Sequence, residues 1–367
     1  MKKKPLIITA LASVVGIAGY FVGIRNHKKQ ESQKQKFPLR SGVPEADTDT
    51  ILGCDQNYSL DYDRKVSILI TGAESYIGEN FRSYAKQHYG NNFIIATLDM
   101  QNPKWREHPF TTEEGCPFDT VFHVAGIAHA DVGSTSIKEQ EKYYRVNTDL
   151  ALEVARKSKD AGVAQFVFMS SMIVYGDTEF IDRNTKPSPD NFYGDSKWQA
   201  DKGVRTLADE DFRVAVLRPP MIYGKGSKGN YPVLSKLARK LLVFPEYKNK
   251  RSMLYIENLC DFLCLIMLTG KGGIYFPQNN DYTSTSHLVR EIGISTCHLT
   301  YTSNLLNPFV AIAMHAPVKK VRNLALKAFG SSYYDQDIST YKGLDYQKVD
   351  LRRSIILTEN SKSVTVE

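Results

Sequence analysis

Cysteine is scarce in this 367-residue sequence. Its five cysteines, at positions 54, 116, 260, 264 and 297, show neither C-x-x-C spacing nor the pattern of a disulfide framework. Cys260 and Cys264 lie four residues apart in an apolar segment, which is typical of core side chains rather than of metal ligands. We therefore predict a protein of a reducing compartment, with no disulfide scaffold and no metal site.

Low-complexity stretches and internal repeats are also lacking. Hydrophobic residues make up 42% of the chain, which suffices for a large α/β domain with a smaller one.

An excess of basic residues is missing from most of the chain. Of 47 Lys and Arg and 40 Asp and Glu, residues 1–40 hold nine and one, which leaves 38 basic and 39 acidic residues. This balance predicts no nucleic-acid partner for the main body.

Charged residues are absent from the segment Leu6–Ile24. At about 1.5 Å per residue its helix would span about 28 Å, close to the hydrocarbon core of a bilayer. We predict a membrane anchor in residues 1–29 and a polar linker in residues 30–64. A cleaved signal or a soluble extension are the alternatives, but no A-x-A-like cleavage site follows. Lys and Arg are more numerous after the segment than before it, so the downstream side is expected to be cytoplasmic.

Apolar runs alternate with helical patterns from Lys65 onward. The runs are apolar at consecutive positions, as in strands buried on both faces: 66–71, 93–98, 120–125, 165–169 and 214–217. Helical patterns cover 79–89, 136–161 and 190–209, and glycine follows the first two. This alternation predicts an α/β doubly wound parallel sheet, a Rossmann domain, over residues 65–222. From residue 223 the rhythm weakens, which indicates a smaller C-terminal lobe over 223–367, mainly for substrate binding.

The first apolar run leads directly into TGAESYIGEN. Gly72 and Gly78 have the spacing of a dinucleotide fingerprint, in which a tight turn aims a helix N-terminus at a pyrophosphate. Ser75 stands where a glycine is usual. Asp99 follows the second run, 27 residues after Gly72, and is placed to accept hydrogen bonds from a ribose. It favours NAD, because a carboxylate would repel a 2′-phosphate.

Tyr193 and Lys197 form a Y-x-x-x-K pair on one helical face. An ammonium beside a phenol favours the phenolate, so we expect the pKa of Tyr193 to fall from about 10 toward neutrality. Tyr193 could then take a proton from a sugar hydroxyl while hydride leaves for nicotinamide. Ser171, after the run Phe166–Met169, is expected to hydrogen-bond the same oxygen.

The segments TGAESYIG, VFHVAG, YYRVNTD, FMSSMIVYG, FYGDSK and LRPPMIYG occur in the order of the extended short-chain dehydrogenase/reductase family. Over residues 66 to about 300 the chain resembles its NAD-dependent epimerase/dehydratase branch, in particular the UDP-hexose 4-epimerase-like enzymes. The chief departures are Ser75 and Met221, which stands near the place of an asparagine at the substrate phosphate. RPPMIYG is more similar to enzymes of bacterial surface-polysaccharide pathways.

The resemblance implies roles for individual residues. Asn147 is expected to support the active site. The catalytic set would be Ser171, Tyr193 and Lys197, and the substrate set Ser171, Tyr193 and Arg251, with Arg251 on the nucleotide diphosphate. The NAD set would be Gly72, Ser75, Tyr76, Ile77, Gly78, Asp99, Ala125, Gly126, Tyr193 and Lys197.

Met172 and Ile173 stand where the family's dehydratases carry Asp-Glu, and neither can transfer a proton. We therefore expect no 4,6-dehydratase. The resemblance favours an NAD-dependent 4-epimerase of a UDP-hexose or UDP-N-acetylhexosamine for polysaccharide biosynthesis. An NAD(P)H-dependent 4-ketoreductase of a nucleotide- or lipid-linked sugar, or a non-catalytic membrane-tethered NAD-binding protein, are the alternatives. The enzyme is expected at the inner (cytoplasmic) membrane, anchored by residues 6–24 with its catalytic domain in the cytoplasm. The resemblance also implies a homodimer, with 136–161 and 190–209 in its interface.

Overall fold

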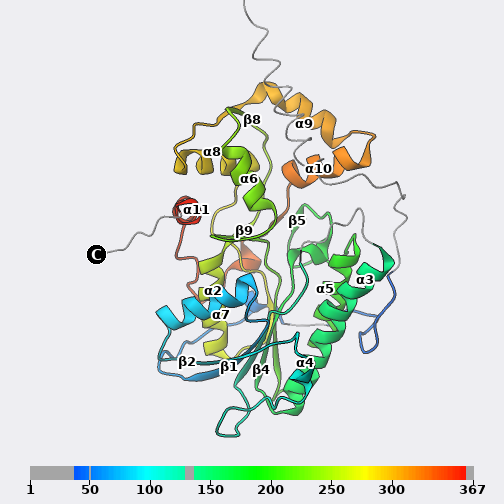
Figure 1. Ribbon diagram of the computed structural model, residues 1–367, viewed down its shortest axis with the longest axis vertical. Helices are drawn as coiled ribbons and strands as arrows, with labels where there is room; N and C mark the ends of the chain where they lie inside the picture. The colour runs from blue at the N-terminus through cyan, green and yellow to red at the C-terminus, as the bar shows by residue number, and fades with distance from the viewer. Residues whose placement is uncertain (1–36, 49–50, 129–135, 361–367) are drawn as a thin grey trace, which may run out of the picture.

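A six-stranded parallel sheet forms the lower half of the molecule in Figure 1. The computed structural model describes residues 37–48, 51–128 and 136–360. The strand order is β10-β6-β4-β3-β1-β2, and every neighbouring pair is parallel. The strands are β1 (Val66–Thr71), β2 (Phe93–Leu98), β3 (Thr120–His123), β4 (Gln165–Met169), β6 (Arg213–Leu217) and β10 (Gly273–Tyr275). The predicted α/β doubly wound architecture is confirmed.

The direction of winding reverses beside β1. The chain runs from β1 outward to β2 and returns to β3 on the other side of β1. Helices that connect such strands lie on opposite faces, so a crevice opens at the carboxyl ends of β1 and β3. The turn after β1, Gly72, and the loop after β3, Ala125 and Gly126, both reach this crevice.

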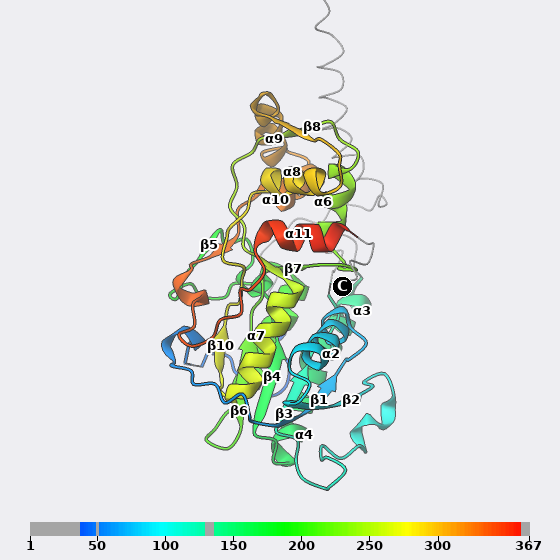
Figure 2. The ribbon, with the colours of Figure 1, turned by 90° about the vertical axis from the view of Figure 1, so that its left-hand side faces the viewer.

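Helices cover both faces of the sheet because successive strand side chains point to opposite sides. Ile68 and Ile70 of β1 join a core cluster with α2 (Tyr76–His88) and α7 (Ile256–Thr269). Leu69 joins a second cluster with α4 (Leu150–Asp160) and α5 (Phe192–Arg205). Figure 2 shows α2 and α7 side by side in front of the strands. Edge strand β2 departs from the expected two-sided burial, since its inner positions are partly exposed.

The helix expected over 136–161 contains a π-helical segment. It comprises α3 (Ile137–Tyr143), η3 (Tyr144–Asp149) and α4. A π-helical turn contains about one residue more than an α-helical turn, and this changes the directions of its side chains. Such segments are frequent at functional sites. Here η3 contains Asn147, which is fully buried.

The second half of the chain builds a smaller lobe but also returns to the sheet. The lobe holds α6 (Asn230–Ala238), α8 (Thr285–Ser295), α9 (Asn307–Met314), α10 (Lys319–Phe329) and α11 (Leu351–Glu359). Short parallel strand pairs join β7 (Met221–Tyr223) to β9 (Met253–Tyr255), β8 (Val243–Pro245) to β11 (Tyr301–Ser303), and β5 (Phe180–Ile181) to β12 (Tyr333–Tyr334). Short helical turns are η1 (Gly53–Asp55), η2 (Pro103–Arg106), η4 (Met172–Tyr175), η5 (Asn304–Leu306) and η6 (Asp337–Ser339). Residues 223–367 thus form mainly the lobe, while α7 and β10 within this range complete the Rossmann layers.

The segment expected to be a polar linker is largely packed on the domain. Of residues 30–64, the structure describes 37–48 and 51–64. Tyr58 is buried in the core, and Leu52 forms a parallel bridge with Ile274 beside β10. Residues 37–48, here called the strap, lie along α5. The strap is part of the folded domain, because its backbone carbonyls accept hydrogen bonds from side chains of α5.

The predicted anchor, residues 6–24, lies outside the described residues. Within residues 37–48, 51–128 and 136–360, no helix is both long enough and apolar enough to cross a bilayer.

Candidate active site

The turn after β1 requires its two glycines. Gly72 has φ +85°, and a Cβ atom there would lie 2.7 Å from the Ala125 backbone. A Cβ atom at Gly78 would lie 2.7 Å from the carbonyl oxygen of Ala73. Both distances are shorter than non-bonded carbon contacts allow, so only glycine permits β1, the loop after β3 and α2 to meet this closely.

Ser75 explains why the middle glycine is dispensable. Its φ of −74° is accessible to any residue, and its side chain accepts a hydrogen bond from the Gly78 N–H at 3.1 Å. Ser75 is therefore the N-cap of α2, and it leaves other N–H groups of the first turn facing the crevice. The buried Tyr76 hydroxyl has no hydrogen-bond partner in the described part of the chain, while Ile77 packs against the core.

Asp99 lies at the end of β2, where a ribose-binding carboxylate was expected. It is exposed, and one of its oxygens accepts the Gln101 N–H at 2.8 Å. The second oxygen is left for a ligand hydroxyl. The glycine turn, a helix N-terminus and a carboxylate at the neighbouring strand end together fit a dinucleotide.

Ser171 and Tyr193 meet at the carboxyl end of β4. Ser171 follows β4 and caps η4 by accepting the Ile173 N–H at 3.3 Å. Tyr193 lies in the first turn of α5, whose start is fixed by Asn191 accepting the Gly194 N–H at 2.9 Å. The Ser171 hydroxyl is near enough to the Tyr193 phenol to act on its pKa, which it lowers. The structure thus brings the predicted pair together at the carboxyl end of β4.

Lys197, one turn along α5, is buried and points to the backbone of β4. Its Nζ donates to the Met169 carbonyl at 3.0 Å and lies 5.3 Å from the Phe168 ring centroid. Burial lowers the pKa of Lys197 to about 8, while the charge of Asp201 acts to raise it.

The prediction that the pKa of Tyr193 is lowered is wrong for the protein without its ligands. Burial raises the pKa of Tyr193 to about 12, and Tyr143, whose ring centroid is 6.1 Å away, adds to the shift. The Ser171 hydroxyl acts in the opposite direction but has a smaller effect. Because Lys197 is directed to Met169 instead of the phenol, desolvation dominates.

Asn147 fixes the loop that borders the crevice. Its Oδ1 accepts the Ile127 N–H at 2.8 Å, and its Nδ2 donates to the Ile127 carbonyl and the Ser196 hydroxyl, each at 3.1 Å. A Cβ atom at Gly126 would lie 3.1 Å from both the Asn147 Oδ1 and the Lys197 Nζ. The loop after β3, the π segment and α5 are therefore locked together around Lys197.

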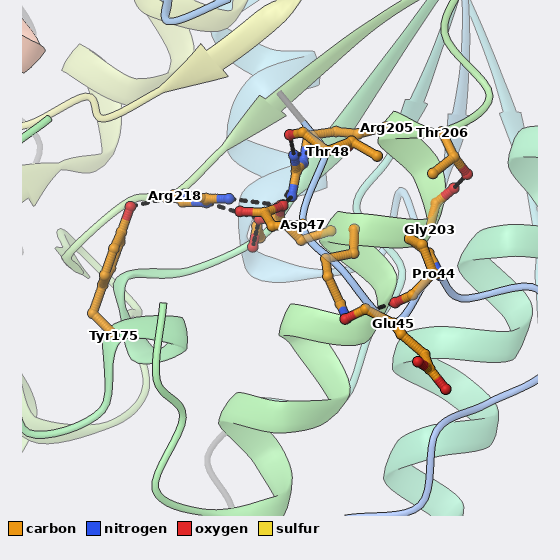
Figure 3. Close-up of polar contacts among 12 residues, drawn as sticks. Pro44, Glu45, Asp47, Thr48, Tyr175, Gly203, Arg205, Thr206 and Arg218 are labelled. Carbon is orange, nitrogen blue, oxygen red and sulfur yellow. Dashed lines mark hydrogen bonds and ion pairs between the residues drawn. The ribbon is translucent and has the colours of Figure 1, made fainter. Parts of the chain in front are cut away.

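A buried ion network lies behind the pair of Ser171 and Tyr193. Asp201 accepts two hydrogen bonds from Arg218, at 2.8 and 2.9 Å, and one from the Ser170 hydroxyl at 2.7 Å. Arg218 also donates to the Tyr175 hydroxyl at 2.7 Å (Figure 3). Burial acts to raise the pKa of Asp201, but Arg218 and Arg205 hold it below its ordinary value.

Arg205 connects this network with the strap. It donates to Asp201 at 3.0 Å and to the Thr48 carbonyl at 2.8 Å, and it forms an ion pair with Asp47 (Figure 3). Lys202 donates to the carbonyls of Pro44 and Glu45 at 2.7 and 3.1 Å. The strap is thus joined to α5, the helix that carries Tyr193.

Arg251 lies apart from this cluster, beside the last turn of α10 in the smaller lobe. Its guanidinium donates to the carbonyls of Lys327 and Ala328, at 2.7 and 3.3 Å. Burial lowers the pKa of Arg251. No ion pair joins it to a carboxylate among the residues that the structure describes, so its charge is left for an anion.

Sequence reasoning missed Asp201, Arg205, Arg218 and the strap. A signal was present, because Tyr193, Lys197, Asp201 and Arg205 follow one another at intervals of four along one helix. No group of three or more His, Cys, Asp or Glu that could hold a metal ion occurs within the described ranges.

The fold and the site define an enzyme of the dinucleotide-dependent dehydrogenase type. A family model described as "NAD dependent epimerase/dehydratase family" matches residues 68–276, which is more than half of the sequence. The chain belongs to this family, and its cofactor is NAD.

Characterised relatives are sugar 4-epimerases. A UDP-glucose 4-epimerase of Vibrio cholerae is 27% identical over 64% of this chain and 77% of its own. An N-acetyl-alpha-D-glucosaminyl-diphospho-ditrans,octacis-undecaprenol 4-epimerase of Escherichia coli is 28% identical over 66% of this chain and 78% of its own. The UDP-glucose 4-epimerase of Thermus thermophilus, solved with NAD, has a TM-score of 0.57 at 18% identity, covering 80% of this chain and 97% of its own. This structural likeness shows the shared fold.

Proposed function

We propose that this protein is an NAD-dependent 4-epimerase of a diphosphate-linked hexose or N-acetylhexosamine. The observation that carries the proposal is the placement of Ser171 near Tyr193, one helical turn before Lys197, in a chain of the NAD-dependent epimerase family. The relatives named as 4-epimerases support the same reaction at C4.

Each residue has a defined task. The turn with Gly72 and Gly78 and the carboxylate of Asp99 would hold NAD, which would supply a reversible hydride acceptor for C4. Ser171 and Tyr193 hold the C4 oxygen, and Tyr193 removes or supplies its proton. Asn147 fixes the loop after β3 to α5, and Lys197 lies next to Gly126 of this loop. Met172 and Ile173 in η4 offer no proton-transfer group, which supports epimerisation over loss of water.

The test is incubation with UDP-glucose, UDP-galactose and their N-acetyl counterparts, with analysis of the nucleotide that copurifies. An epimerase interconverts a C4 pair with its own bound NAD and needs no added NAD(P)H. Stoichiometric consumption of NAD(P)H would instead identify a 4-ketoreductase. Binding of NAD without turnover would identify a non-catalytic protein.

A lipid-linked sugar is a second candidate substrate. The Escherichia coli relative is named for an undecaprenol-diphosphate-linked sugar, and it matches as much of this chain as the UDP-glucose 4-epimerase of Vibrio cholerae does. Arg251 suits either substrate, because both carry a diphosphate. Parallel assays with the UDP-linked and the lipid-linked N-acetylhexosamine separate the two.

Membrane anchoring by residues 6–24 belongs to the same proposal, with the catalytic domain on the cytoplasmic face of the inner membrane. Its support is an uncharged 19-residue run flanked by Lys and Arg. Removing residues 1–30 should release active protein from membranes, and recovery of the full chain in the soluble fraction would contradict it.

A homodimer through α3–α4 and α5 is the remaining proposal. The strap occupies part of α5, so such a dimer must include the strap in its interface or displace it. The mass of the purified protein by light scattering distinguishes the monomer from the dimer.

A further inference from the structure

Helix α9 is apolar on both of its faces. Its sequence NPFVAIAM contains one polar residue, Asn307. Leu306 and Val310 point inward and are buried. Leu305, Pro308, Phe309 and Ile312 follow the i, i+3, i+4, i+7 spacing of one helical stripe, and all four are exposed. Leu305 is 81% exposed and Ile312 is 68% exposed. Exposure of such an apolar stripe to water is unfavourable, so the pattern indicates that a lipid or protein surface covers it.

More apolar surface adjoins this stripe. Tyr301 of β11 and Leu299 lead into η5 and α9, and both are exposed. The Tyr301 N–H donates to the carbonyl of Leu242, which is exposed as well. Val318, between α9 and α10, is exposed as well. Figures 1 and 2 place α9 and β8 at the end of the molecule farthest from the sheet.

The charge around this surface is mainly basic, although Glu246, whose carbonyl accepts a hydrogen bond from the Asn307 side chain, lies beside α9. Residues 292–334 contain no Asp or Glu, whereas α10 contributes Arg322 and Lys327. Helix α10 packs against α9, and its residues Ala325 and Phe329 are buried. An apolar face bordered by basic residues fits a lipid bilayer with anionic headgroups, because acyl chains take the apolar side chains and phosphates take the cations.

We propose that α9 and α10, the α9–α10 hairpin, dock on an anionic membrane surface, with the exposed stripe of α9 inserted among the lipids. This is a contact of the folded domain, separate from any anchor in residues 6–24. It does not depend on the identity of the sugar substrate.

The hairpin is connected to the candidate diphosphate site. Arg251 donates to the carbonyls of Lys327 and Ala328 in the last turn of α10. Docking of the hairpin therefore holds Arg251 near the headgroup layer. A diphosphate whose lipid remains in the bilayer would reach Arg251 over a shorter path than one in bulk water.

The test places a tryptophan on the stripe of the full-length protein in vesicles of phosphatidylcholine and phosphatidylglycerol. Ile312→Trp is the probe, and Leu305→Trp repeats it at a second exposed position. Tyr62→Trp is the matched control, since Tyr62 is 61% exposed and precedes β1 at the other end of the molecule. Emission of the unsubstituted protein, from Trp105 and Trp198, is subtracted.

Acyl chains brominated near the headgroup should quench at least about half of the added emission at 312 and 305, and little at 62. The quenching should weaken in pure phosphatidylcholine. An anchor alone would leave the probes at 312 and 62 equally unquenched, which would overturn the proposal. Blue-shifted emission that bromine does not quench would show that protein covers the stripe, either a second copy or residues 6–24, and would also overturn it. Undiminished quenching without phosphatidylglycerol would contradict the requirement for anionic lipid.

Discussion

Burial governs ionisation at the candidate active site. It raises the pKa of Tyr193 to about 12 and lowers that of Lys197 to about 8. At neutral pH the phenol therefore keeps its proton and is ready to donate it to a ketone oxygen. Removal of a proton from a sugar hydroxyl requires the pKa of Tyr193 to fall when the site is filled, since a base must be free of its proton.

Replacing Tyr193 by phenylalanine removes the proton donor but keeps the ring against Tyr143. Turnover should fall by about 10²–10⁴-fold, because general acid–base catalysis contributes that much. Bound NAD should remain, as the glycine turn and Asp99 are unchanged. Tyr62→Phe, at an exposed tyrosine, is the control and should keep the parental rate. An unchanged rate in Tyr193→Phe would remove this residue from the mechanism.

His123 is expected to make folding sensitive to acid. It is fully buried on β3, its Nδ1 is 2.7 Å from the Thr71 hydroxyl, and burial lowers its pKa from 6.5 to about 3. Between these values the unfolded chain binds a proton that the folded chain does not. The free energy of unfolding should therefore decrease as pH falls through this range, by about 1.4 kcal/mol per pH unit.

Urea unfolding of the parent and of His123→Gln at several pH values between 4 and 7 measures this dependence. The variant should have the smaller slope of stability against pH, whatever its stability at pH 7. Equal slopes would show that His123 does not bind the extra proton on unfolding.

At the scale of elements, the strap and α5 act as one unit. Arg205 has a side chain that is 1% exposed and connects Asp201 with Asp47 and Thr48. Asp201 in turn holds Ser170, the neighbour of Ser171. The strap therefore stabilises the helix that carries Tyr193 and the loop that carries Ser171.

Arg205→Met should lower the free energy of unfolding by about 2–4 kcal/mol, since it removes one partner of a buried ion pair. Arg183→Met is the control, because Arg183 and Asp55 form an exposed pair that should contribute about 1 kcal/mol or less. Denaturant midpoints measure both. A loss in Arg205→Met no larger than in the control would show that the strap adds no stability through Arg205.

At the scale of the whole molecule, local patterns predicted the parallel sheet, the glycine turn and the pair of Ser171 and Tyr193. They succeed because buried strands, tight turns and helix faces leave a signal within a few residues. Contacts between distant segments left no such local signal. They include the contact of the strap with α5, the return of α7 and β10 to the sheet, and the direction of the Lys197 side chain. The raised pKa of Tyr193 was missed for the same reason, because desolvation depends on the complete packing around the phenol.

The central claim, epimerisation through hydrogen transfer from C4 and back, is tested most directly with a substrate deuterated at C4. The protein is incubated with UDP-[4-²H]glucose without added NAD(P)H, and the products are analysed by NMR; the N-acetyl and lipid-linked analogues are treated in the same way. The account predicts a C4 epimer that keeps its deuterium at C4, since the hydrogen passes to the bound cofactor and returns. Conversion with loss of deuterium to solvent, or conversion only with added NAD(P)H, would contradict it.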